Sequence, residues 1–139
     1  DILYIAAERG TVLRSTDRGA SWVYLDTGYK GSLWTGLVLH DGSLLVAGLR
    51  GTAYRSRDGG KSWNPATTNT RSSITDLVEA GNTVWGVALD GVTLSSSDGG
   101  ASFVARQRQD RLALTTAAVA ADGSVLSFSK RGLVTAETP

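Results

Sequence analysis

The stretch SRDGGKSW, at Ser56–Trp63, decides the fold because it recurs on either side in nearly the same form. The earlier copy is STDRGASW at Ser15–Trp22, and the later copy is SSDGGASF at Ser96–Phe103. The aspartates of the three copies lie 41 and then 40 residues apart: Asp17, Asp58 and Asp98. A fixed period of this length indicates a repeat architecture in which each unit is one supersecondary element.

The period extends over the whole chain. One glycine recurs at intervals of 41, 40 and 41 residues: Gly10, Gly51, Gly91 and Gly132. Three threonines align with the same step: Thr35, Thr75 and Thr116. The third unit shows the pattern within a period, with β-prone runs at 74–80, 83–89, 92–95 and 102–105. Four strands in about 40 residues predict an all-β fold, a β-propeller with four-stranded antiparallel blades and almost no helix.

The repeated motif is expected to act as a structural staple of each blade. A Ser or Asp side chain can accept backbone N–H bonds two or three residues on, a glycine can take the positive φ of the turn, and a large aromatic can start the outer strand. Three equivalent copies favour this role over catalytic carboxylates. The predicted structural residues are Ser15, Asp17, Gly19, Trp22, Ser56, Asp58, Gly60, Trp63, Ser96, Asp98, Gly100 and Phe103.

These motifs resemble the Asp-box (bacterial neuraminidase repeat) propellers. The longer strings RGTVLRSTDRGASW (9–22) and RGTAYRSRDGGKSW (50–63) are similar to the photosystem II stability/assembly factor family and its bacterial relatives. The third unit departs from them, with Asp90 and Ser95 in place of arginines and Phe103 in place of Trp, and Pro139 stands where a fourth Asp is expected. Sialidases, sortilin-type receptors and several glycosidases share the Asp box, so it indicates fold better than activity. The resemblance implies a periplasmic, otherwise exported or membrane-associated setting.

Labelled A to D from inside to outside, the strands follow the order B-C-D, A-B-C-D, A-B-C-D, A-B-C. The corresponding units are 1–26, 32–67, 72–106 and 111–137, which together form one partial propeller of about three and a half blades. Propellers protect their strand edges by closing a ring. The chain also lacks methionine and opens inside a strand-like run. We therefore expect the C-terminal half of a six- to eight-bladed ring, with the other blades in the missing part of a parent chain.

Composition excludes several classes of function. The 14 Lys and Arg nearly balance the 13 Asp and Glu, which disfavours nucleic-acid binding, and no run reaches the roughly 18 apolar residues of a membrane span. Without cysteine and with His40 as the only histidine, thiolate sites, a histidine triad and a zinc site lack their residues. The spaced acidic ligands of a calcium loop and a phosphate-binding glycine loop are absent too, so neither metal nor cofactor is expected.

The balanced total conceals an uneven distribution. In blade geometry the D–A and B–C connections emerge on one face. This face carries nine basic residues but only four acidic ones, which are Glu8, Asp26, Asp90 and Asp110. Arg14 and Arg55 belong to the opposite end of strand C, where we expect them to brace carboxylates or pack their stems. Arg9, Arg50 and Arg131 recur at one position and form an arc. The predicted partner-binding residues are Arg9, Arg50, Arg131, Lys30, Arg71, Arg111, Tyr29 and Trp34.

Three functions remain open. The first is a non-catalytic protein-binding or assembly module whose partner is acidic or exposes the carboxylates of a nascent membrane protein. The second is a sialidase-like glycoside hydrolase, although the only glutamates, Glu8, Glu79 and Glu137, show no evident tyrosine partner, and catalytic residues would lie mostly in the missing half. The third is a receptor ectodomain that binds peptides in its channel. The charges of the basic face can also be ordinary solvated loop residues.

Overall fold

The computed structural model describes residues 1–134, which form four antiparallel sheets without an α-helix. The first and last sheets have three strands each: β1 (Leu3–Ala6), β2 (Thr11–Ser15), β3 (Val23–Asp26), and β12 (Thr116–Val119), β13 (Val125–Ser129), β14 (Gly132–Val134). The middle sheets have four each: β4 (Leu33–Val38), β5 (Leu44–Gly48), β6 (Ala53–Ser56), β7 (Asn64–Pro65), and β8 (Ile74–Ala80), β9 (Thr83–Ala88), β10 (Val92–Ser96), β11 (Val104–Gln107).

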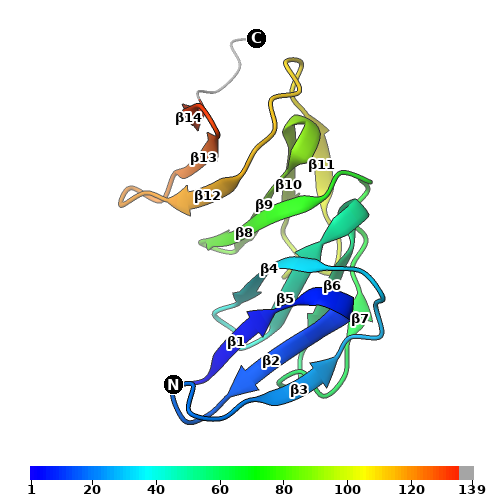
Figure 1. Cartoon of the computed structure of the whole chain (residues 1–139). Coiled ribbons are helices and arrows are strands. Elements are labelled where there is room, and N and C mark those ends of the chain that lie inside the picture. Colours follow the sequence, from blue (N-terminus) through cyan, green and yellow to red (C-terminus); the bar gives the residue numbers. More distant parts are fainter. Residues whose placement is uncertain (135–139) are drawn as a thin grey trace.

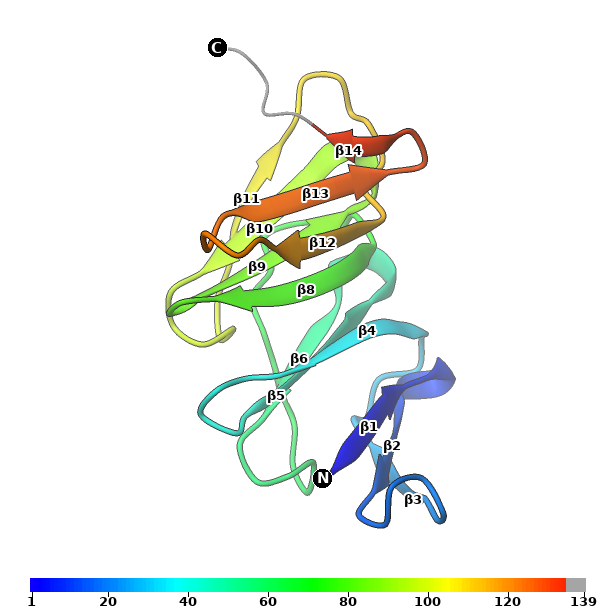
Figure 2. The ribbon, with the colours of Figure 1, turned by 90° about the vertical axis from the view of Figure 1, so that its left-hand side faces the viewer.

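The four sheets follow one another along the molecule in chain order (Figure 1). Within each sheet, neighbours in sequence are neighbours in space, and the inner strands β4, β8 and β12 lie side by side (Figure 2). The prediction of an all-β propeller with four-stranded antiparallel blades, about three and a half of them, is confirmed. Among residues 1–134 no helix has the length and apolar character needed to cross a membrane. Glu137, Pro139 and the predicted limit at 137 lie outside the described residues.

The hydrophobic cores lie between successive sheets, as expected when each sheet has two faces to bury. Val12, Leu33 and Val46 fill the space between the first and second blades. A larger cluster that includes Leu45 and Leu94 joins the second blade to the third. Val87, Leu114 and Ala117 join the third blade to the fourth. Each blade is therefore held by its neighbours, so the repeats support one another rather than folding as separate units.

The inner strands β4 and β8 each contain a β-bulge near their start. The pairing register passes from Ile74↔Ala88 to Asp76↔Val87, so Thr75 is left unpaired in the ladder. In the fourth blade Thr116 pairs with Phe128 at the place that corresponds to Asp76. In the second blade the same bulge leaves Trp34 unpaired, and Thr35 pairs with Ala47. Asp76, rather than Thr75, is therefore the counterpart of Thr35 and Thr116, and the predicted alignment of Thr75 with these two threonines is wrong. The glycine and Asp-box landmarks are unaffected.

Candidate functional site

Two opposite edges of the sheet stack carry the loops. The box face holds the three Asp boxes and the β4–β5, β8–β9 and β12–β13 turns, which reach the left edge of Figure 2. The connection face holds the 3-10 turns at 8–10, 49–51 and 89–91, the β13–β14 turn, and the links that lead from one blade to the next. The two edges therefore differ in what they carry, with the repeated motif on one and the blade-to-blade links on the other.

Each Asp box is closed by its own side chains. In the second box the hydroxyl of Ser56 accepts the Gly60 N–H at 2.8 Å and donates to Asp58 Oδ1 at 2.8 Å. Asp58 also accepts the Ser62 N–H at 2.9 Å and the Ser62 hydroxyl at 2.6 Å. The first and third boxes repeat these bonds with nearly the same distances. The boxes therefore use their carboxylates to close a turn.

This hydrogen bonding holds the box carboxylates in their charged form. The Ser62 hydroxyl, followed by the Ser62 N–H and the Ser56 hydroxyl, lowers the pKa of Asp58 to about 2. The corresponding bonds lower the pKa of Asp17 to about 2, and that of Asp98 is lowered as well. A general acid needs a pKa near the working pH, so these groups are suited to bracing rather than proton transfer.

The box aromatics add a contact that the sequence did not predict. The indole N–H of Trp63 donates to the Gly60 carbonyl at 3.0 Å, and Trp22 does the same to Gly19 at 3.1 Å. Phe103 lacks this donor but is buried, with 3% exposure. Each aromatic lies one residue before its outer strand, since β3, β7 and β11 begin at the following residue. The expectation that these rings start the strand is wrong by that one residue.

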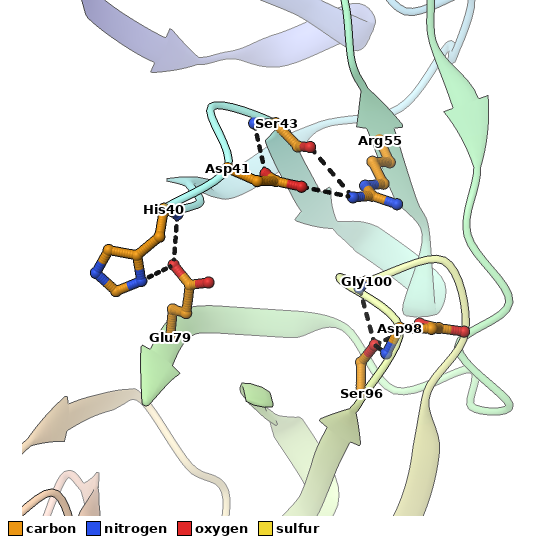
Figure 3. A network of polar contacts seen from close by, with 8 residues as sticks. All are labelled: His40, Asp41, Ser43, Arg55, Glu79, Ser96, Asp98 and Gly100. Atoms are coloured by element: carbon orange, nitrogen blue, oxygen red, sulfur yellow. Dashed lines mark hydrogen bonds and ion pairs between the residues drawn. The ribbon is translucent and has the colours of Figure 1, made fainter. Parts of the chain in front are cut away.

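Two further pairs of charged side chains lie on the box face (Figure 3). Nη2 of the buried Arg55 lies 3.3 Å from Asp41 Oδ2 and donates to Ser43 Oγ at 3.1 Å, which confirms that this arginine braces a carboxylate. His40 Nδ1 lies 2.9 Å from Glu79 Oε2, and the His40 N–H donates to the same oxygen at 2.8 Å. These contacts join the β4–β5 turn to the body of its own blade and to the next blade.

The connection face is held by backbone hydrogen bonds around the recurrent glycine and by threonine hydroxyls, since Thr27 donates to the Gly10 carbonyl at 2.8 Å and Thr68 to the Gly51 carbonyl at 2.6 Å. The Gly10 N–H donates to the Gly31 carbonyl at 2.9 Å, and the Thr27 N–H donates to the Gly10 carbonyl at 3.0 Å. In the second blade, Gly51 has φ +72°, and a Cβ placed there would lie 2.1 Å from the Thr70 carbonyl oxygen. The recurrent glycine therefore lets each 3-10 turn press against the link to the next blade.

The basic residues predicted as partner-binding lie on this face without hydrogen bonds or ion pairs at their side-chain charges, although the charge of Arg131 contributes to the lowered pKa of Asp110. The guanidinium and ammonium groups of six exposed residues form no ion pair or hydrogen bond with any of residues 1–134: Arg9, Lys30, Arg50, Arg71, Arg111 and Arg131. Arg108 differs, because it pairs with Asp110 at 2.7 Å. The third blade interrupts the arc with Asp90, whose carboxylate accepts a bond from Ser72 at 3.1 Å.

The two aromatic residues predicted for this face have different surroundings. Trp34, on β4, is 45% exposed. Tyr29 packs into the core between the first and second blades, 6.1 Å from the ring of Tyr54, and its hydroxyl donates to the Leu49 carbonyl at 3.3 Å. Tyr29 thus braces the connection between two blades, whereas Trp34 offers contact area.

Asp76 joins three blades and was missed by the sequence analysis. Its Oδ1 accepts bonds from the Thr35 hydroxyl at 3.2 Å and from the Leu77 N–H at 2.9 Å. Its Oδ2 accepts from the Thr116 hydroxyl at 2.5 Å and from the Ala117 N–H at 3.0 Å. All four donors are protein groups, so this carboxylate links the inner strands. Among residues 1–134 no group of three or more His, Cys, Asp or Glu side chains is arranged to hold a metal ion.

Comparisons with known proteins agree with this architecture. Residues 54–65 match the BNR/Asp-box repeat family, so the predicted resemblance to Asp-box propellers is confirmed. A comparison with curated protein sequences gives no match.

Similar solved structures include "YCF48 bound to D1 peptide", with 22% identity and a TM-score of 0.64 over 91% of this chain and 42% of that one. They also include an ancestral GH74 enzyme, with 18% identity and a TM-score of 0.73 over 95% and 20%. A third is the extracellular domain of the putative one component system BT4673 from B. thetaiotaomicron, with 14% identity and a TM-score of 0.74 over 96% and 19%. At these identities the likeness shows a shared fold, and the chain spans less than half the length of each of the three.

Proposed function

We propose that this run of Asp-box propeller blades is a non-catalytic protein-binding module that takes an acidic peptide or protein on its connection face. The observation that carries the proposal is the set of six exposed cations whose side chains make no polar contact with residues 1–134. Exposed guanidinium groups can bind carboxylates with two hydrogen bonds each, and they steer an acidic partner from a distance. The exposed ring of Trp34 supplies apolar contact area beside them.

The similar structure of YCF48 carries a D1 peptide, which supports a peptide or protein as the class of partner. The repetition of Arg9 and Arg50 at one turn position favours an extended ligand that crosses more than one blade. Both residues have a positive φ, 55° and 56°, so the two turns present their side chains from the same backbone conformation. Asp90 occupies this position in the third blade, and we expect the ligand to bind less tightly there.

The alternative function is that of a glycoside hydrolase, and an activity assay distinguishes it from peptide binding. The likeness to a GH74 enzyme is a likeness of fold and covers 20% of that chain. In the present chain Glu79 is held by His40, and the box aspartates are held by their serines. Turnover of an aryl glycoside by this protein, lost on substitution of carboxylates in these blades, would replace the binding proposal.

The binding proposal is tested with a labelled peptide of alternating Glu and Ser that ends in a free carboxylate. The control peptide carries Gln for Glu and a C-terminal amide. We expect the acidic peptide to bind more tightly and to weaken with added salt, because exposed charges are screened. Changing Arg9, Arg50 and Arg131 to Glu should abolish binding.

The matched control changes two exposed cations of the box face, Arg18 and Lys61, to Glu, and it is compared with the double change of Arg9 and Arg50 to Glu. Both double variants alter the net charge by the same amount, so the comparison separates local contacts from overall charge. Binding should survive in the box-face variant and be strongly weakened in the other. Equal loss in both double variants, or equal binding of both peptides, would contradict the proposal.

A further inference from the structure

A second candidate site lies on the box face, between the second blade and the third Asp box. It is a cavity of about 220 Å³ lined by Arg55, Arg57, Asn64, Pro65 and Ala101. Next to the cavity, the second and third blades are joined by backbone contacts. The Thr67 N–H donates to the Ala101 carbonyl at 3.0 Å, and Thr67 pairs with Ser102 in a parallel bridge. The cavity therefore has walls from two blades that are fixed relative to each other.

The polar side chains that line the cavity converge because of strand register. Arg55 on β6 lies opposite Asn64 on β7, and directly opposed residues of an antiparallel pair project from the same face of the sheet. Arg57 follows Arg55 by two residues. The site thus combines two guanidinium groups with one side-chain amide, and none of the five lining residues is a carboxylate.

Arg55 has a hydrogen-bonding group that the fold does not use. Its side chain is 7% exposed, and its Nη2 is directed to Asp41 and Ser43 (Figure 3). Its Nε is buried and has no hydrogen-bond partner among the described residues. A buried donor without an acceptor is unfavourable, more so when the group is charged, so an acceptor at this place would be favourable.

We propose that this cavity binds a small oxyanion, a carboxylate or phosphate group, held between Arg55 and Arg57 with Asn64 as a further donor. The planar fork of a guanidinium matches both kinds of oxyanion. The volume is below the roughly 300–1,000 Å³ of clefts for drug-sized ligands, which favours a small anion. Asp41, already 3.3 Å from Arg55, neutralises part of the charge and limits the affinity. The site is independent of the connection face and of the function proposed for it.

The proposal is tested by NMR on the ¹⁵N-labelled chain, by following the Nε–Hε resonances of Arg55 and Arg57. Sodium acetate and sodium phosphate are titrated separately, with ionic strength held constant by sodium chloride. We expect saturable shifts of both resonances with at least one of the two anions, and the anion that saturates identifies the chemistry. If neither anion gives a saturable shift, the proposal is overturned.

Two variants separate a site from general charge effects. Arg57 is exposed, so Arg57→Gln should keep the fold and raise the dissociation constant about tenfold, the loss expected for one charge-assisted contact. Lys61→Gln removes the same charge from the same Asp box without touching the cavity, and it should leave the dissociation constant within about twofold. Unchanged anion binding in Arg57→Gln, or equal weakening in both variants, would overturn the proposal.

Discussion

The two faces of the blade stack are held by different parts of the chain. On the box face, side chains close the turns: Ser56 and Asp58 bond to each other and to the backbone, and Arg55 is paired with Asp41. On the connection face, uncharged groups make the corresponding contacts: backbone groups and glycines at Gly10 and Gly51, together with the hydroxyls of Thr27 and Thr68. On the box face the carboxylates of the three boxes are occupied by their serines, and Arg55 is occupied by Asp41. On the connection face six exposed cations make no hydrogen bond or ion pair with residues 1–134 and are available to a partner.

The largest expected effect comes from breaking the backbone contact of the connection face. Gly51→Ala forces a side chain into φ +72° and places its Cβ against the Thr70 carbonyl oxygen, so we expect a loss of about 2–4 kcal/mol in the free energy of unfolding. Urea denaturation measures this loss. Arg50→Gln, one residue earlier, is exposed and should change the same free energy by no more than about 0.5 kcal/mol. A large loss in Arg50→Gln would show that its side chain holds the fold.

The next effect breaks a side-chain contact of the box face. Ser56 is fully buried and serves both the Gly60 N–H and Asp58, so Ser56→Ala should cost about 1–3 kcal/mol. Thermal or urea unfolding gives the value. The control is Ser97→Ala, which removes the same hydroxyl from an exposed position of the third box and should be nearly neutral. Equal losses in both variants would argue against the hydrogen-bonded role of Ser56.

Acid weakens the box face by protonating the carboxylates of the Asp boxes. The pKa of Asp58 is about 2 in the folded chain against an ordinary value of 3.8, so its contribution to stability is complete above pH 3.8 and is lost as pH falls through 2. The urea midpoint of unfolding should therefore fall as the pH is lowered from 3.8 to 2. In Asp58→Asn the fall should be shallower, because one of these carboxylates is gone. An unchanged pH dependence in this variant would contradict the hydrogen-bonded state of Asp58.

The smallest expected effect on stability comes from a substitution in the strands between the two faces, at Gly36 on β4. A Cβ at this position would meet its nearest neighbours, Leu45 and Val46, at 3.5 Å, beside a cavity of about 120 Å³ between the first two blades. Gly36→Ala should therefore stabilise the chain by about 0.4–1 kcal/mol, chiefly by restricting the unfolded chain. The measurement is the urea midpoint. Destabilisation here would mean that loss of a glycine is harmful even where space is open, and it would weaken the interpretation of Gly51→Ala.

The sequence predicted what depends on local spacing and missed what depends on contacts between blades. The Asp boxes were predictable because Ser56, Asp58 and Gly60 interact within four residues. The link through Asp76 was not, because it needs the bulge at Thr75 and donors from two other blades. Tyr29 was assigned to a contact surface because its link is adjacent to basic residues, whereas its hydroxyl bonds to the second blade at Leu49. Whether a long side chain packs inward or faces solvent is decided by such tertiary contacts.

The central claim, that the connection face binds an acidic partner, is tested most directly by a gain of binding. Asp90→Arg places an arginine at the position that Arg9 and Arg50 hold in the first two blades, in a turn with the same backbone conformation. Ser95→Arg restores an arginine at the box end of the same blade, where the others carry Arg14 and Arg55. We predict that Asp90→Arg lowers the dissociation constant for the acidic peptide about two- to fivefold and that Ser95→Arg leaves it unchanged. No change in Asp90→Arg, or an equal gain in both variants, would contradict the account.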